Sequence, residues 1–131
     1  MNFLEQVIST KKKEIEESKT RLPPHEIERA ALALVGKWEI RPFKNIFDGE
    51  EVALIAEIKI KSPSEGRLTD LDHRQIAHLY ADSGADAISV LTDRTYFDGD
   101  LSYLHDVKKI VPQPIFRKDF VIDVYQIYET F

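Results

Sequence analysis

The stretch Ala53-Leu54-Ile55-Ala56-Glu57-Ile58-Lys59-Ile60-Lys61-Ser62-Pro63-Ser64-Glu65-Gly66 determines how the rest of the sequence is interpreted. At the two-residue period of a strand, one side of residues 52–60 is wholly apolar, and the other side changes from apolar residues to Glu57 and Lys59. This change predicts a strand that begins in a core and ends at a polar cavity, where parallel α/β folds place their active sites. An amphipathic antiparallel strand with a solvated Glu/Lys face fits the same pattern, so both interpretations stay open.

The composition narrows the class of protein. The sequence has 131 residues, of which 43% are hydrophobic and 31% charged, as expected for one globular domain. Its net charge of -5 argues against a chain-wide surface for nucleic acid but leaves room for a local anion site. The absence of cysteine excludes disulfides and Cys-ligated metals. No signal peptide or membrane span is recognisable, so we expect a soluble, cytoplasmic protein.

Two helices are predicted ahead of the central strand. Apolar residues recur at helical spacing between residues 3 and 19, and a second helix is predicted from Pro24 to Gly36. The basic triplet Lys11-Lys12-Lys13 fits either an anion site or a solvated helix face. Glutamates within a turn or two of the triplet favour the solvated face.

The rest of the chain alternates between helices and strands. Helices are predicted at 71–84, at 101–110 and from about 123 onward, and strands at 85–92 and 114–120. This alternation predicts right-handed βαβ crossovers and a parallel sheet, so the fold class is α/β. Such a sheet would end on an unpaired strand with little cover. We therefore expect the chain to be one part of a larger domain.

Three strand ends carry side chains suited to chemistry: Glu57, Lys59 and Ser62 after the first, Phe97 after the second, and Phe116, Lys118 and Phe120 on the third. A lysine can act as a general acid, and a nearby carboxylate can hold or exchange its proton. Phenylalanines and paired lysines suit a flat, anionic aromatic substrate. In the alternative interpretation, Phe116 and Phe120 are core residues and Arg117-Lys118-Asp119 is an ordinary surface ion cluster.

Metal and nucleotide chemistry are disfavoured. The four histidines lack metal-ligand spacing, since His73 and His78 lie five residues apart rather than four. Ser64-Glu65-Gly66 supplies one glycine where a dinucleotide-binding loop needs several. The sequence therefore predicts no metal and no cofactor.

Three motifs, in this order and at this spacing, resemble those of the indole-3-glycerol phosphate synthase family. They are residues 55–64, residues 89–92 with Tyr96-Phe97-Asp98-Gly99, and Arg117-Lys118-Asp119-Phe120 with Asp123 and residues 125–129. The two leading helices are similar to the family's amino-terminal extension. The resemblance covers essentially the whole chain, but only the front part of the family's sequence.

The resemblance implies a carboxy-lyase of tryptophan biosynthesis, which cyclises, decarboxylates and dehydrates a carboxyphenylamino-deoxyribulose phosphate to indole-3-glycerol phosphate. It implies that Lys118 protonates the ketone oxygen, that Lys59 contacts substrate anions and assists proton transfer, and that Glu57 is its carboxylate partner. Ser62 would contact the substrate carboxylate. Walls around the aromatic ring are implied at Pro63, Phe97 and Phe120.

The same resemblance implies an incomplete (β/α)₈ TIM barrel, with a helical extension over 1–46 and the first three β/α units over 47–131. Such a barrel needs about eight strands to close. Later strands carry the family's phosphate-binding loops and a further acid/base glutamate, so this chain alone is expected to be inactive. Two hypotheses follow: a part of an active synthase, or an inactive amino-terminal fragment that self-associates through open strand edges.

Overall fold

The computed structural model describes residues 1–131, and these divide into two compact units. The first unit comprises Met1–Glu39 together with Phe120–Phe131, and the second comprises Ile40–Asp119. Every strand belongs to the second unit. None of the helices combines the length and apolar character that crossing a membrane requires.

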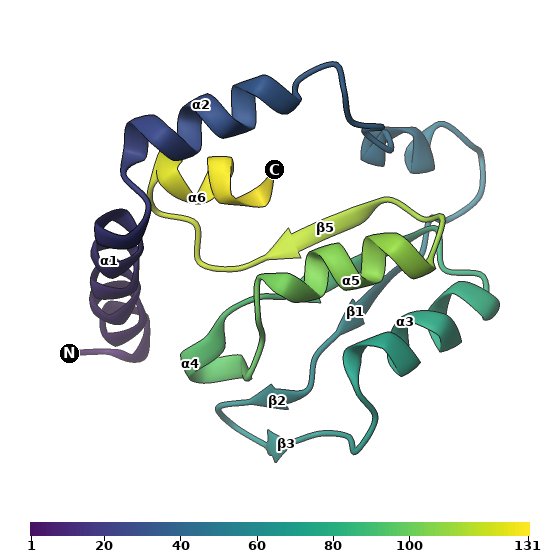
Figure 1. Cartoon of the computed structure of the whole chain (residues 1–131). Coiled ribbons are helices and arrows are strands. Elements are labelled where there is room, and N and C mark those ends of the chain that lie inside the picture. The colour runs from purple at the N-terminus through teal and green to yellow at the C-terminus, as the bar shows by residue number, and fades with distance from the viewer. The chain divides into compact units, whose positions relative to one another are not determined.

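The first unit is helical, with α1 at Phe3–Arg21, α2 at Pro24–Leu34 and α6 at Val124–Thr130 (Figure 1). The start of α1 is fixed by a capping box, in which the side chains of Asn2 and Glu5 each accept a hydrogen bond from the other residue's backbone N–H. Pro24 occupies the first turn of α2, where its missing N–H costs nothing. The predicted helices from residue 3 and from Pro24 are confirmed, each ending within two residues of its predicted end.

The three helices of this unit pack around a small core. Ile15, Ile27 and Tyr125 are its buried members, one from each helix. The Tyr125 hydroxyl also lies 3.1 Å from the carbonyl of Ser18 and 3.0 Å from that of Leu22. Because those carbonyls end α1, the tyrosine ties α6 to the C-terminal turn of that helix.

The second unit is organised on a parallel sheet of three strands in the order β1-β4-β5, with bounds Ile55–Ile58, Ala87–Leu91 and Ile115–Lys118. The central strand β4 is buried along its whole length. Residue Glu57 lies opposite Ser89, and Ser89 lies opposite Phe116. The predicted parallel α/β sheet is confirmed, and the antiparallel interpretation of residues 53–61 is wrong for β1. The sheet does not close into a barrel.

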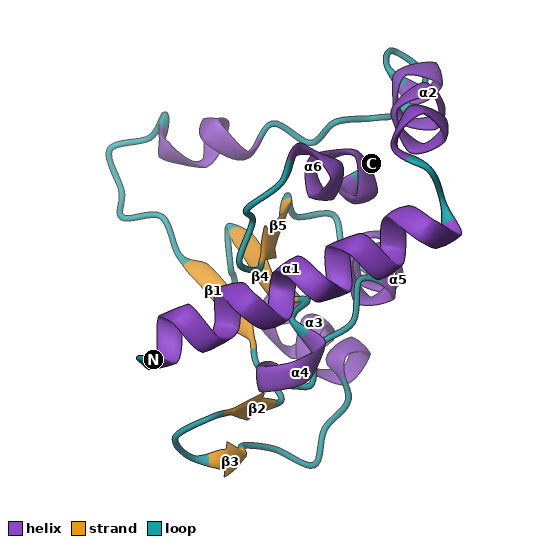
Figure 2. Cartoon of the chain, turned by 90° about the vertical axis from the view of Figure 1, so that its left-hand side faces the viewer, coloured by secondary structure: helices purple, strands orange, loops and turns teal.

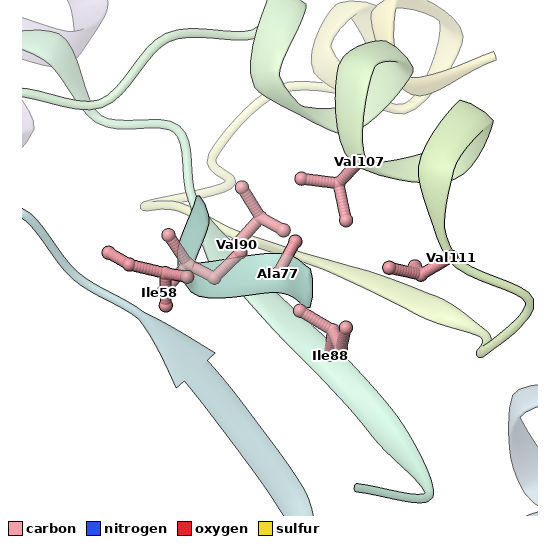
Figure 3. Close-up of a cluster of buried hydrophobic side chains, with 7 residues drawn as sticks. Ile58, Ala77, Ile88, Val90, Val107 and Val111 are labelled. Carbon is pink, nitrogen blue, oxygen red and sulfur yellow. The ribbon is translucent and has the colours of Figure 1, made fainter. Parts of the chain in front are cut away.

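Two helices cover one face of this sheet, α3 at His73–Asp82 and α5 at Ser102–Ile110 (Figure 1). Figure 3 shows the apolar side chains that meet there, which are Ile58, Ile88 and Val90 from the strands and Ala77, Val107 and Val111 from the helical side. Asp72 caps α3 through a second capping box. By strand alternation, Glu57, Ser89 and Lys118 lie on the opposite face.

Three short elements were not predicted: a 3₁₀ helix η1 at Phe43–Phe47, a hairpin of β2 at Lys61–Ser62 with β3 at Gly66–Arg67, and a one-turn helix α4 at Arg94–Phe97. The chain leaves the main sheet after Ile58, so residues expected to extend β1 form the hairpin instead (Figure 2). Gly66 adopts a φ of 71°, which lets the chain reverse after Pro63-Ser64-Glu65.

Arg41 anchors the segment that leads into the second unit. Its guanidinium donates hydrogen bonds to the carbonyls of Lys108, Val111 and Gln113 at 3.0, 2.7 and 3.0 Å. These carbonyls lie at the C-terminal end of α5, where a cation is favoured by the helix dipole. Phe43, which follows Arg41 closely in the chain, has its ring centroid 5.7 Å from that of Phe116.

The loop after β4 depends on a close backbone approach at Gly99. The Gly99 N–H donates to the carbonyl of Asp93 at 2.8 Å, and a Cβ on Gly99 would clash with the carbonyl oxygen of Leu91. Asp98, just before it, has a left-handed φ of 56°. The geometry explains why the motif Tyr96-Phe97-Asp98-Gly99 ends in glycine.

We predict that Gly99→Ala lowers the free energy of unfolding by about 1–3 kcal/mol, because the new methyl group displaces the loop from the end of β4. Gly49→Ala is the matched control, since the nearest atom to its added Cβ lies 3.9 Å away. Urea denaturation followed by circular dichroism measures both variants. Equal stability of the two would show that the loop can relax around a side chain at residue 99.

Candidate active site

One carboxylate binds two lysines at the carboxyl ends of the strands. The Lys59 Nζ lies 2.8 Å from Glu57 Oε1, and the Lys118 Nζ lies 2.8 Å from Glu57 Oε2. Glu57 comes from β1 and Lys118 from β5, so their side chains meet across β4. The sequence predicted that these three residues belong to one site, and the structure brings them together.

Glu57 is ionised in this arrangement. Partial burial acts to raise the pKa of Glu57, but hydrogen bonds from Lys118 and then Lys59, with the charges of both lysines, outweigh it and leave the pKa below its ordinary value. A carboxylate with two ammonium groups carries a net charge of about +1. Side-chain exposures of 34% for Lys59 and 54% for Lys118 leave both within reach of a solvent-borne anion.

Ser62 and Pro63 lie in the β2–β3 hairpin. Ser62 is buried, its hydroxyl oxygen accepts the Glu65 N–H at 3.1 Å, and it lies 3.4 Å from the Ser64 hydroxyl. Pro63 is exposed at the turn. The Ser-Pro-Ser-Glu-Gly motif therefore builds its own turn, with the Ser62 side chain as an internal brace.

The predicted aromatic walls are distributed over both units. Phe97 is half-buried at the end of α4, a helix that packs beside β2. Phe120 belongs to the first unit, where its carbonyl accepts a hydrogen bond from Gln126 Nε2 at 3.1 Å. Phe116 is 48% exposed, so its interpretation as a core residue is wrong. The roles of Phe97, Phe120 and Pro63 as substrate walls stay predictions.

The residues on either side of Lys118 are not a surface ion cluster, contrary to one sequence interpretation. The side chains of Arg117 and Asp119 are only 8% and 3% exposed and form an ion pair at 3.1 Å. Thr92 joins them through a 2.7 Å hydrogen bond to Asp119. Sequence reasoning gave Thr92 no role, and it gave Arg117 and Asp119 none beyond a surface ion cluster. The signal that could have found the buried pair is the two-residue period, which places residues 117 and 119 on the face opposite Lys118.

The buried histidine of this unit has a structural partner. His73 Nε2 lies 2.8 Å from Asp106 Oδ2, and the His73 ring stacks on Tyr103 with centroids 3.8 Å apart. Arg74 bonds the same carboxylate oxygen at 2.7 Å. These contacts join α3 to α5. No group of three or more His, Asp or Glu side chains is placed to hold a metal ion.

Comparison with known proteins identifies the family of this chain. The family model of indole-3-glycerol phosphate synthase matches residues 4–131. The chain belongs to this family. Curated indole-3-glycerol phosphate synthases that it resembles include those of Thermoanaerobacter sp. (strain X514), 42% identical over 97% of this chain, and Geobacillus sp. (strain WCH70), 46% identical over 98%. The synthase of Desulforamulus reducens is 48% identical over 66% of this chain.

The match does not extend over the whole of these synthases. The aligned residues make up 48% of the Thermoanaerobacter synthase and 46% of the Geobacillus synthase. The chain thus spans about half the length of the curated relatives it matches. The residues matched by the family model include both β1 and β5, and with them Glu57 and Lys118.

We predict that Glu57 contributes a pH-dependent stability. Because its pKa is lowered on folding, its contribution is present above its ordinary pKa of about 4.5 and is lost as the pH falls through the lower folded value. The free energy of unfolding of the parent chain, relative to Glu57→Gln, should therefore decrease between about pH 6 and pH 3.5. Urea titrations at both pH values measure it, and a difference that grows on acidification would contradict the pairing of Glu57 with two lysines.

Proposed function

We propose that this chain supplies the ring-closing part of an indole-3-glycerol phosphate synthase, acting on a carboxyphenylamino-deoxyribulose phosphate. The observation that carries the proposal is the single carboxylate of Glu57 bound at 2.8 Å by both Lys59 and Lys118. The group is cationic overall and partly exposed, and the substrate carries a carboxylate and a phosphate. An anion would thus be drawn to the end of the sheet where proton transfer is needed.

In this proposal Lys118 is the general acid. Closing the ring forms a carbon–carbon bond at the ketone carbon, and the electron pair of the carbonyl bond moves onto oxygen, which takes a proton from the Lys118 ammonium. The Lys118 Nζ lies 2.8 Å from Glu57 Oε2, so the proposed proton donor stands next to a carboxylate before substrate binds. Lys59 binds substrate anion and assists proton transfer, with Glu57 as the carboxylate that both lysines share. Loss of carbon dioxide and then of water completes the indole.

The remaining predicted residues would orient the substrate. Ser62 would bind its carboxylate, and Pro63 and Phe97 would contact the aromatic ring. The role of Phe120 as a further wall is a prediction from the family resemblance alone. The hairpin position of Ser62 and the neighbouring α4 support this assignment for Ser62 and Phe97. Absence of a cofactor and a cytoplasmic location remain predictions from the sequence.

We further propose that residues 47–131 are the first three β/α units of a (β/α)₈ barrel and residues 1–46 its helical extension. The parallel order β1-β4-β5 supports this, since consecutive barrel strands pair in chain order. Binding of the phosphate and the later proton transfers would then fall to the half of the synthase that this chain does not span.

The second candidate is an inactive, self-associating fragment. In the sheet β1 and β5 each pair with one strand only, and apolar side chains on both are exposed, with Ile55 at 42% and Phe116 at 48%. Open edges with apolar neighbours favour pairing with another chain. This candidate differs from the first in turnover, and the two are separated by direct assay.

We predict that a fusion of residues 1–131 to the remaining part of the Geobacillus synthase turns over the substrate, and that Lys118→Ala lowers its kcat by roughly 10²–10⁴ because the proton donor is lost. Indole fluorescence measures the product. The unfused chain, with its own Lys118→Ala variant as a contamination control, should yield none. Unchanged turnover in the fused Lys118→Ala variant would remove the assignment of Lys118 as the acid.

In the same fusion we predict that Phe97→Ala mainly raises KM, since it removes a contact to the aromatic ring and leaves the proton donor in place.

We predict that the unfused chain self-associates with rising concentration. Multi-angle light scattering between about 10 μM and 1 mM should show a mass above that of the single chain. Replacing Phe116 with lysine puts a charge beside the β5 edge and should shift the mass toward the monomer. A stable monomer of the parent chain over this whole range would exclude association through the strand edges.

A further inference from the structure

Thr92 contacts three consecutive residues around the lysine of the candidate site. It directly follows β4, and its backbone N–H donates to the Lys118 carbonyl at 3.0 Å. Its hydroxyl donates to Asp119 Oδ2 at 2.7 Å and accepts from Arg117 Nε at 3.2 Å. One threonine thus holds the main chain of Lys118 and the side chains on both sides of it.

These contacts are buried. Thr92 is 6% exposed, and the Arg117 and Asp119 side chains are 8% and 3% exposed. Arg117 Nη2 donates to Asp119 Oδ2 at 3.1 Å, so this carboxylate oxygen accepts from both the guanidinium and the hydroxyl. A buried ion pair adds little net stability because both charges lose water on folding. What it does provide is a fixed geometry, since breaking any contact leaves a buried charge poorly compensated.

The direction of the Lys118 side chain follows from that geometry. Residues 117 and 119 lie on one side of the extended chain, and Lys118 lies on the other, where it meets Glu57. The Lys118 side chain is half exposed, and a lysine side chain has a flexible four-carbon stem. Its ammonium position therefore depends on where its main chain is held.

We propose that Thr92, Arg117 and Asp119 are positioning residues for Lys118, which hold the end of β5 so that the lysine reaches Glu57. This inference rests on the proposed function for its catalytic meaning. The three residues act through Lys118 and contact no substrate. A shift of about 1 Å in a reacting group can cost 10²-fold in rate, so positioning of this kind has a measurable effect.

The test measures the Glu57–Lys118 contact directly in the 131-residue chain. The titration midpoint of the Glu57 side-chain carboxyl carbon is followed by ¹³C NMR and assigned with Glu57→Gln. Lys118→Met, which removes the ammonium, sets the midpoint for a broken contact. We expect it to lie above that of the parent chain, because one of the two charges that lower the pKa of Glu57 is gone.

Thr92→Val removes the hydroxyl while keeping the shape of the side chain. We expect it to raise the Glu57 midpoint by at least about half of the Lys118→Met change, and Thr92→Ser, which keeps the hydroxyl, to restore the parent value. Asp119→Asn, which removes the negative charge from the ion pair, should act in the same direction as Thr92→Val. A Thr92→Val chain that is folded by NMR but has the parent midpoint overturns the proposal.

Asp106→Asn is the matched control. It removes the carboxylate charge that pairs with His73 and Arg74, and so lowers stability at the contact between α3 and α5. We expect the Glu57 midpoint to stay at the parent value in this variant. A midpoint that rises equally in Asp106→Asn and Thr92→Val would mean that general loosening, and not positioning, moves the lysine, which also overturns the proposal.

Failure of this inference and failure of the proposed function give different results. If the midpoint responds to Thr92 but the fused enzyme makes no product, positioning stands and the synthase assignment falls. If the fused enzyme is active with Lys118 as its acid but the midpoint ignores Thr92, the positioning role falls alone.

Discussion

Backbone pairing of β4 with a strand on each side sets where Glu57 and Lys118 lie. Because β4 is buried along its length, its register with β1 and β5 is fixed, and a slip of one residue would exchange the apolar and charged faces. The parallel direction brings the carboxyl ends of all three strands to one edge. Glu57 and Lys118 are 61 positions apart in the chain, counted from their numbers, yet they meet at that edge.

Charge compensation explains how the sheet tolerates these residues. On the helix-covered face the strands contribute mainly apolar side chains to the core, while the opposite face carries one carboxylate between two lysines. The partly buried Glu57 would be costly alone, but it is ionised with two cationic partners. At the end of β5 both faces carry charges. Arg117 and Asp119 form a buried ion pair on one face, and Lys118 pairs with Glu57 on the other. Each charge of the strand end thus has an opposite charge within hydrogen-bond distance.

Sequence periodicity was informative where local pattern and burial agree. The two faces of β1 were evident from the alternation through Ile58. The alternation could not show that the chain leaves the sheet after Ile58, because the β2–β3 hairpin depends on Gly66 and on Ser62 binding the turn. The requirement for glycine at residue 99 likewise arises from the Leu91 carbonyl, which only the fold brings near. The burial of Arg117 could not be predicted for the same reason, since two adjacent basic residues in a sequence usually indicate a solvent-exposed segment.

The positions of Glu57, Lys59 and Lys118 also show which part of the candidate site a chain of half a synthase's length can form by itself. Glu57, Lys59, Lys118 and Thr92 all lie within Ile40–Asp119, so their mutual distances need no strand beyond β5. Phe120 is not part of this group, because it belongs to the first unit. In the proposed function, the group that protonates the ketone oxygen is therefore positioned locally, by three strands and one buried threonine. Enclosing a substrate and excluding water require surfaces on several sides, and a sheet with two open edges provides only one of them. Under the proposed function, the placement of the acid is thus separable from catalysis by the whole synthase.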